Sequence, residues 1–111
     1  MKILFVCSAN ELRSRTAEDH FSQKYPEVEF SSAGTNHKIC KQKGTTPLEE
    51  EMLKEADIVY VMENKHKDVI IKNVGDAYNK KIKVLHIKDV YNYYQKELIQ
   101  LLEEKITIGN G

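Results

Sequence analysis

Apolar runs along this chain alternate with segments in which apolar residues recur every three or four positions. The runs are typical of buried strands and predict four of them, at residues 2–6, 28–33, 57–62 and 81–87. Helical spacing predicts helices at residues 14–24, 64–73 and 97–106, and a further helix that begins at Thr46-Pro47. Strands that alternate with helices indicate an α/β fold with a parallel sheet, in a single domain over residues 1–111.

The polar segment after the second strand, Thr35–Gly44, is predicted to be a loop rich in lysine. Its cysteine, Cys40, is interpreted as an ordinary loop thiol. Four strands and about four helices predict a three-layer sandwich, and ligands of such sheets bind beyond the carboxyl ends of the strands. The residues at or just past those ends are Cys7, Ser32, Met62 and Asp89.

Composition narrows the classes of function. The formal net charge is zero, so no global field favours nucleic acid or a membrane surface as a partner. No apolar stretch approaches the ~20 residues of a membrane-spanning helix. The two cysteines form no C-x-x-C pair, and the sequence predicts no disulfide framework, no metal site and no cofactor. These features favour a reducing, cytoplasmic setting, and they carry no prediction of an oligomeric state.

The strongest chemical signal is a cysteine and an arginine six residues apart, Cys7 and Arg13, directly after the first strand. A turn from a strand into a helix aims backbone N–H groups and the helix N-terminus at one spot, which favours a thiolate and attracts a dianion. Arg13 adds a planar fork that matches two phosphate oxygens. Ser14 is predicted to cap the helix and to donate to the Cys7 sulfur, while Asn10 shapes the turn. The segment therefore predicts phosphate monoester chemistry through a cysteinyl-phosphate.

The same segment resembles the low-molecular-weight protein tyrosine phosphatases, in the run Val6-Cys7-Ser8-Ala9-Asn10-Glu11-Leu12-Arg13-Ser14. Further similarities follow in order along the chain, in Ser32–Thr35, in Ala56–Met62 with His66, and in Asp89-Val90-Tyr91. The last of these resembles the family's late acid motif, D-P-[YW]. The resemblance covers nearly the whole chain and implies a phosphotyrosine phosphatase I-like fold, with a four-stranded parallel sheet in flavodoxin-like order.

The resemblance also implies a role for each matching residue. Cys7 would be the nucleophile, and Asp89 would protonate the leaving oxygen and then activate water. Arg13 would bind the phosphate together with the loop, whose residues are Ser8, Ala9, Asn10, Glu11, Leu12 and Ser14. A supporting hydrogen-bond network would consist of Asn10, Ser14, Ser32 and His66. Tyr91 would lie at the rim, and the substrate would be a phosphorylated protein or a small aryl phosphate, hydrolysed without a metal.

The sequence departs from the family pattern at four positions. Ala9 stands where the family commonly has glycine, and Leu12 where many members have a second cysteine, so a protective disulfide within the loop is not available. Arg15 and Val90 each replace a proline. The segment between the second and third strands is also short, which predicts a more open pocket and a broader range of substrates.

Three alternative functions remain open from the residues alone. One is a non-catalytic phosphate-binding or partner-binding relic of the fold, because fold alone does not establish activity. Another is a cysteine phosphocarrier subunit of a sugar phosphotransferase system, which does not need an arginine six residues after the cysteine. A third is an arsenate reductase, which needs two further cysteines. Arg13 and Asp89 favour the phosphatase over the phosphocarrier and, together with Cys7, over the relic. Only Cys40 remains for the thiol relay of an arsenate reductase, which disfavours that function.

Overall fold

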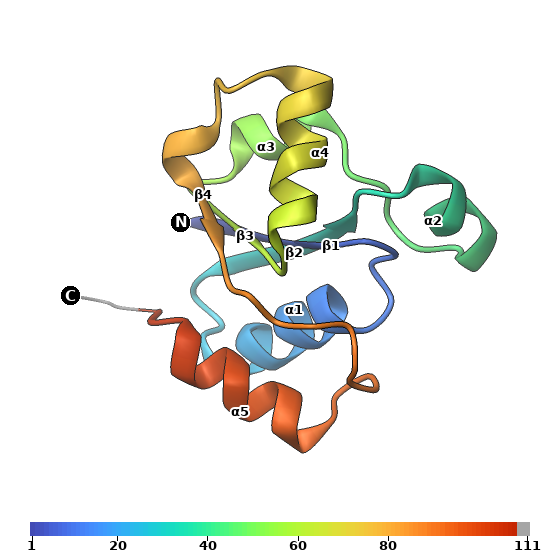
Figure 1. The fold of residues 1–111 in the computed structure, drawn as a ribbon. Coiled ribbons are helices and arrows are strands. Elements are labelled where there is room, and N and C mark those ends of the chain that lie inside the picture. Colours follow the sequence, from blue (N-terminus) through green and yellow to red (C-terminus); the bar gives the residue numbers. More distant parts are fainter. Residues whose placement is uncertain (109–111) are drawn as a thin grey trace.

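Four parallel strands form a sheet between two layers of helices in the computed structural model, which describes residues 1–108 (Figure 1). The strands are β1 (Lys2–Cys7), β2 (Glu29–Gly34), β3 (Ile58–Val61) and β4 (Ile82–Val84). The helices are α1 (Arg13–Lys24), α2 (His37–Lys43), α3 (Glu50–Glu55), α4 (Asn64–Val74) and α5 (Lys96–Lys105), with a short 3₁₀ turn, η1, at Asn79–Lys81. Within residues 1–108, no helix is both long and apolar enough to cross a bilayer.

The order of the strands across the sheet is β2-β1-β3-β4, and every neighbouring pair is parallel. This confirms the predicted fold class, including the flavodoxin-like order. The chain runs from β1 outward to β2 and then returns past β1 to β3, so the strand order reverses beside β1. Open α/β sheets bind their ligands at such a reversal point, at the carboxyl ends of the strands. Cys7 is the last residue of β1 and therefore occupies that position.

The central strand β1 is buried on both faces, and its residues alternate between two hydrophobic cores. Ile3, Phe5 and Cys7 belong to the core under α1 and α5, while Leu4 and Val6 belong to the core under α3 and α4. Figure 1 shows these helix pairs on opposite faces of the sheet. Cys7 thus extends from a strand that packing holds firmly, and its side chain lies on the α1 side of the sheet.

The segment predicted to be a loop, Thr35–Gly44, contains helix α2, so that prediction is wrong. The Asn36 side chain accepts a hydrogen bond from the Ile39 N–H at 3.1 Å and so caps the start of the helix. Gly44 ends the helix in the left-handed region, with φ at 70°. Cys40 lies in this helix and is fully buried, so the interpretation as an ordinary loop thiol is wrong.

The helix predicted to begin at Thr46-Pro47 starts later, at Glu50. The reason is that the chain at Pro47 runs parallel to the end of β2. The Gly34 N–H donates to Thr46 O at 2.9 Å, and the Leu48 N–H donates to Gly34 O at 2.8 Å. These bonds keep the segment extended until it has passed the edge of the sheet.

The fourth strand is also shorter than predicted, because β4 ends at Val84. His86 has a left-handed backbone, with φ at 57°, which turns the chain away from regular pairing. The Ile87 N–H still donates to Met62 O at 2.8 Å, so the departing segment remains attached to the end of β3. This attachment carries the following residues, including Asp89, across the carboxyl end of the sheet.

Candidate active site

The loop between β1 and α1 is held in place by hydrogen bonds that neighbouring segments donate to its carbonyl groups. Ser8 O accepts from the Asn36 N–H at 2.9 Å, and Ala9 O accepts from the Thr45 hydroxyl at 2.6 Å. In a trans peptide the C=O and the following N–H point in opposite directions. The N–H groups of Ala9 and Asn10 therefore face the interior of the loop, where an anion would be bound.

Asn10 fixes the sharpest bend of the loop. Its backbone is left-handed, with φ at 55°, and the side chain is completely buried. Asn10 Oδ1 accepts from the Thr46 N–H at 3.1 Å, and Nδ2 donates to Ser14 Oγ and Ser32 Oγ, both at 2.8 Å. These bonds confirm the predicted turn-shaping role. Ala9 is not in the left-handed region, so its methyl group adds no backbone strain.

The hydroxyl of Ser14 lies 3.0 Å from the Cys7 sulfur, and both groups are buried. Because Ser14 Oγ accepts a hydrogen bond from the Asn10 amide, its own hydroxyl proton is available to donate to the sulfur. A donated hydrogen bond of this kind stabilises a thiolate. The expected capping role of Ser14 is wrong, however, since α1 begins at Arg13 and Leu12 occupies its N-cap position.

Arg13 is almost completely buried, and one end of its guanidinium group is fixed. Nη1 donates to Glu63 Oε2 at 2.6 Å and to Ile87 O at 2.7 Å. Both bonds use the same nitrogen, so the edge formed by Nε and Nη2 remains for two oxygens of a phosphate. Nε lies 3.7 Å from Asp89 Oδ1, which places the carboxylate against that edge.

Glu63 was not among the predicted site residues, although it directly follows Met62 at the end of β3. The rule that selected Cys7 and Asp89, namely proximity to a strand's carboxyl end, would also have found it. The hydrogen bond from Arg13 lowers the pKa of Glu63, with the arginine's charge acting in the same direction. Glu63 is therefore ionised and orients the arginine rather than contacting a substrate.

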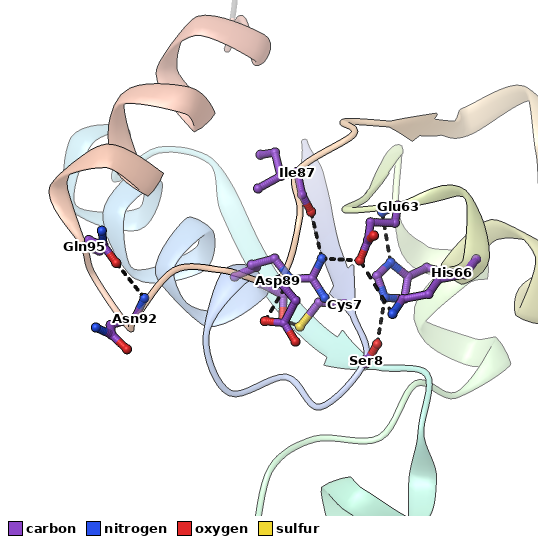
Figure 2. A network of polar contacts seen from close by, with 11 residues as sticks. Cys7, Ser8, Glu63, His66, Ile87, Asp89, Asn92 and Gln95 are labelled. Carbon is purple, nitrogen blue, oxygen red and sulfur yellow. Dashed lines mark hydrogen bonds and ion pairs between the residues drawn. The ribbon is translucent and has the colours of Figure 1, made fainter.

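His66 supports the loop through a second branch of the network, which Figure 2 shows. Its Nδ1 accepts from the Glu63 N–H at 3.0 Å, so the proton of the neutral ring resides on Nε2. Nε2 then donates to Ser8 Oγ at 2.9 Å. Burial lowers the pKa of His66 to about 4, and the nearby Arg13 charge adds to this effect. The four residues predicted to form one network therefore lie in two separate groups. Asn10 bonds Ser14 and Ser32, whereas His66 bonds the loop through Ser8.

A cavity of about 230 Å³ lies above Cys7. Its lining consists of Cys7, Ser8, Ala9, Glu11, Leu12, Arg13, Ile39, Lys43 and Asp89. Two of these, Ile39 and Lys43, come from α2 and were not predicted. Lys43 Nζ lies 3.0 Å from Glu11 Oε2, so the ion pair joins α2 to the loop at the mouth of the cavity.

Tyr91, the predicted rim residue, is half-buried against the core beneath α1 and α5 and does not line this cavity. Helix α2 contributes Ile39 and Lys43 to the rim of the cavity. Cys40 anchors that helix, with its sulfur 3.5 Å from Ala9 O. Gly34 allows the close approach, because a Cβ atom there would lie 2.5 Å from both the Cys40 sulfur and Ser8 O. In the described part of the chain, no three His, Cys, Asp or Glu side chains are grouped to hold a metal ion.

The neutral, buried His66 leads to a prediction about pH. Its pKa is about 4 in the folded protein and near 6.5 when exposed, so the unfolded chain binds an extra proton between these values. The stability that this group contributes is present above pH 6.5 and is lost as the pH falls toward 4, by about 2–3 kcal/mol. Urea unfolding across this range should show a smaller pH slope for His66→Gln than for the original protein. Parallel slopes would mean that folding does not lower the pKa of His66.

No protein-family model matches the chain, and no curated protein matches it in sequence. Solved structures do match. The low-molecular-weight protein tyrosine phosphatase from T. tengcongensis is 27% identical, over 96% of this chain and 99% of that one, with a TM-score of 0.71. A mutant of the YwlE arginine phosphatase with a phosphorylated active-site serine is 26% identical, over 94% and 92% of the chains, with a TM-score of 0.70. The tyrosine phosphatase AmsI from Erwinia amylovora, at 23% identity over 94% and 87%, shares the fold with a TM-score of 0.75.

The sheet order and these structural neighbours show that the chain has the fold of a low-molecular-weight protein tyrosine phosphatase, on a flavodoxin-like sheet. In structure it is similar to phosphatases of that kind over nearly its whole length, at 26–27% sequence identity.

Proposed function

We propose that this protein hydrolyses phosphate monoesters through a cysteinyl-phosphate on Cys7, with phosphotyrosine in proteins as the substrate. One observation carries the proposal. The Cys7 sulfur, held by the Ser14 hydroxyl at 3.0 Å, lines the same cavity as Arg13 and Asp89. A nucleophile, a phosphate-binding fork and an acid thus face one space large enough for a phosphate group. Phosphoryl transfer depends mainly on such positioning and on charge stabilisation.

In the first step, the Cys7 thiolate attacks phosphorus while the bond to the leaving oxygen breaks. Arg13 and the inward N–H groups of the loop hold the oxygens of the phosphoryl group, where negative charge must be stabilised. Asp89, protonated at this stage, gives its proton to the leaving oxygen, so that a neutral alcohol or phenol departs. The products are the phosphorylated cysteine and the dephosphorylated substrate.

In the second step, water attacks the phosphorus of the cysteinyl-phosphate. The Asp89 carboxylate takes a proton from the water, the sulfur–phosphorus bond breaks, and inorganic phosphate leaves. Cys7 returns to the thiolate, which the Ser14 hydroxyl stabilises again. Arg13 and the loop N–H groups therefore stabilise the negative charge in both steps, and Asp89 gives and takes back the one proton that is transferred.

Phosphoarginine is a second candidate substrate, and the lining of the cavity favours it. Asp89 places a carboxylate there, Glu11 adds a second that is paired with Lys43, and within the described residues no aromatic ring lines this cavity. A guanidinium leaving group would be attracted by carboxylates, whereas a phenol gains more from aromatic neighbours. The neighbouring YwlE structure is an arginine phosphatase. Comparing kcat/KM for matched phosphotyrosine and phosphoarginine peptides decides between the two substrates.

If Asp89 is the acid, the loss of rate on replacing it should depend on the pKa of the leaving group. Asp89→Ala should lower kcat/KM, which reports the first step, by about a hundredfold for alkyl phosphates and by much less for p-nitrophenyl phosphate, whose phenolate leaves without a proton. The measurement is a plot of log kcat/KM against leaving-group pKa for both proteins. Asp76→Ala, which removes an exposed carboxylate after α4, is the matched control. An equal loss for every leaving group would show that Asp89 is not the acid.

A further inference from the structure

Two depressions follow the Cys7 cavity in series, because the first shares a residue with the cavity and the second shares a residue with the first. A depression of about 360 Å³ shares Ser8 with the cavity and also contacts His66 and Lys65. A second, of about 290 Å³, shares Lys65 with the first and is lined in addition by Glu63, Asn64, His86 and Lys88. Lys88 directly precedes Asp89, which lines the Cys7 cavity. The hollow surface thus continues past the catalytic cavity, along the carboxyl ends of β3 and β4.

The second depression is positively charged, although the chain as a whole is neutral. Lys65 and Lys88 contribute two ammonium groups. Among the described residues, Glu63 is the one acidic side chain that lines it, and its carboxylate is already paired with Arg13 at 2.6 Å and approached by Lys65 at 3.7 Å. The remaining field therefore favours an anion.

The backbone explains why these residues lie together. Ile87 is buried, and the residues on either side of it, His86 and Lys88, are exposed. The Ile87 carbonyl and the Glu63 carboxylate are both fixed by the same Arg13 nitrogen. The segment that holds His86 and Lys88 is thereby attached to the start of α4, next to Lys65. The residues that line the depression and the guanidinium group of Arg13 are therefore held by the same two hydrogen bonds.

We propose that Lys65, His86 and Lys88 form an anion subsite that binds an acidic side chain of the protein substrate, next to the phosphorylated residue. The inference rests on the proposed phosphatase activity and adds a sequence preference to it. Phosphorylated chains with glutamate or aspartate near the phosphorylated residue bind better than the same chains with amides there. A free phosphorylated amino acid does not reach the subsite.

The test compares phosphotyrosine peptides that carry glutamate at successive flanking positions with peptides that carry glutamine there. The protein should favour glutamate, in kcat/KM, at one or two positions, and added salt should weaken the preference because the charges are exposed. Lys65→Met and Lys88→Met should each reduce the ratio of the two kcat/KM values about threefold, the scale of one exposed ion pair. Lys72→Met, an exposed lysine later in α4, is the control and should leave the ratio unchanged.

Equal kcat/KM values for glutamate and glutamine peptides at every position would overturn the subsite. An equal effect of Lys72→Met would also overturn it, since a general attraction between charges would then explain the preference. The proposed function is tested separately with p-nitrophenyl phosphate, which has no flanking group. If that compound is not hydrolysed, the dissociation constants of both peptide series with the Cys7→Ser protein still test the subsite, because binding requires no turnover.

Discussion

Replacing Cys7 with serine is expected to abolish turnover of p-nitrophenyl phosphate while phosphate or vanadate still binds. A serine hydroxyl is a much weaker nucleophile than a thiolate at neutral pH, so kcat should fall more than about a thousandfold. The oxyanion site remains, because Arg13 stays fixed by Glu63 and the loop carbonyls stay bonded to Asn36 and Thr45. The measurement is hydrolysis with EDTA present, together with a binding titration of the same two proteins.

The matched control is Cys40→Ala, which removes the other thiol of the chain. Cys40 packs against the outside of the loop, so its loss should lower stability and leave measurable turnover. Hydrolysis by Cys7→Ser near the rate of the original protein would rule out the thiol mechanism. Loss of both turnover and oxyanion binding would instead indicate that the substitution disrupts the loop.

Arg13→Lys is expected to lose most of the activity, on the order of a hundredfold to a thousandfold in kcat/KM. The guanidinium group bonds Glu63 and Ile87 through Nη1 and keeps a planar edge for two phosphate oxygens. A lysine ammonium group is a single point and cannot serve both ends at once. The structure therefore predicts a large loss even though the charge is conserved.

Arg15→Lys is the matched control for this prediction, since Arg15 is exposed and lies 4.0 Å from Asp19 on the surface of α1. The control should retain its activity. Both variants are assayed with p-nitrophenyl phosphate and with vanadate as a competitive inhibitor. A mild effect of Arg13→Lys would contradict binding of the phosphate through two guanidinium nitrogens.

The shape of the loop from Cys7 to Ser14 could be predicted from the sequence because its determinants are local. Cys7, Asn10, Arg13 and Ser14 fall within eight consecutive residues, and a strand-to-helix turn constrains them all at once. The chemistry of that turn follows from residue type and spacing. Its shape could be predicted too, since the left-handed position is filled by asparagine, which tolerates it.

The rim could not be predicted, because α2 owes its position to tertiary contacts. The helix has seven residues and no apolar periodicity, so it would be unstable by itself. Its cap at Asn36, its end at Gly44 and the packing of Cys40 on the loop together hold it in place. Asn36 and Gly44 are residues that commonly cap helices, and both can be read from the sequence. They indicate a helix here only in combination with the surface against which α2 packs.

Glu63 and the end of β4 show the same limit for residues that act across long separations in the chain. Glu63 orients Arg13 from fifty positions away, and the chain leaves β4 early because of the backbone at His86. The position of Glu63 after β3 marks it as a candidate, but neither its pairing with Arg13 nor the turn at His86 follows from local pattern. Tyr91 lies in a motif that suggested a rim position, but packing under α5 places it away from the cavity, and its role at the rim stays a prediction.

The central claim is that Cys7 carries the phosphoryl group during hydrolysis. The most direct test is to stop the protein within milliseconds while it turns over p-nitrophenyl phosphate, under conditions that preserve thiophosphate esters, and to locate the phosphate by peptide mass spectrometry. The phosphoryl group should be on Cys7, and each p-nitrophenol should be accompanied by one inorganic phosphate. Phosphate on Cys7 without release of inorganic phosphate would indicate a phosphocarrier, and hydrolysis with no phosphate on Cys7 would contradict the mechanism.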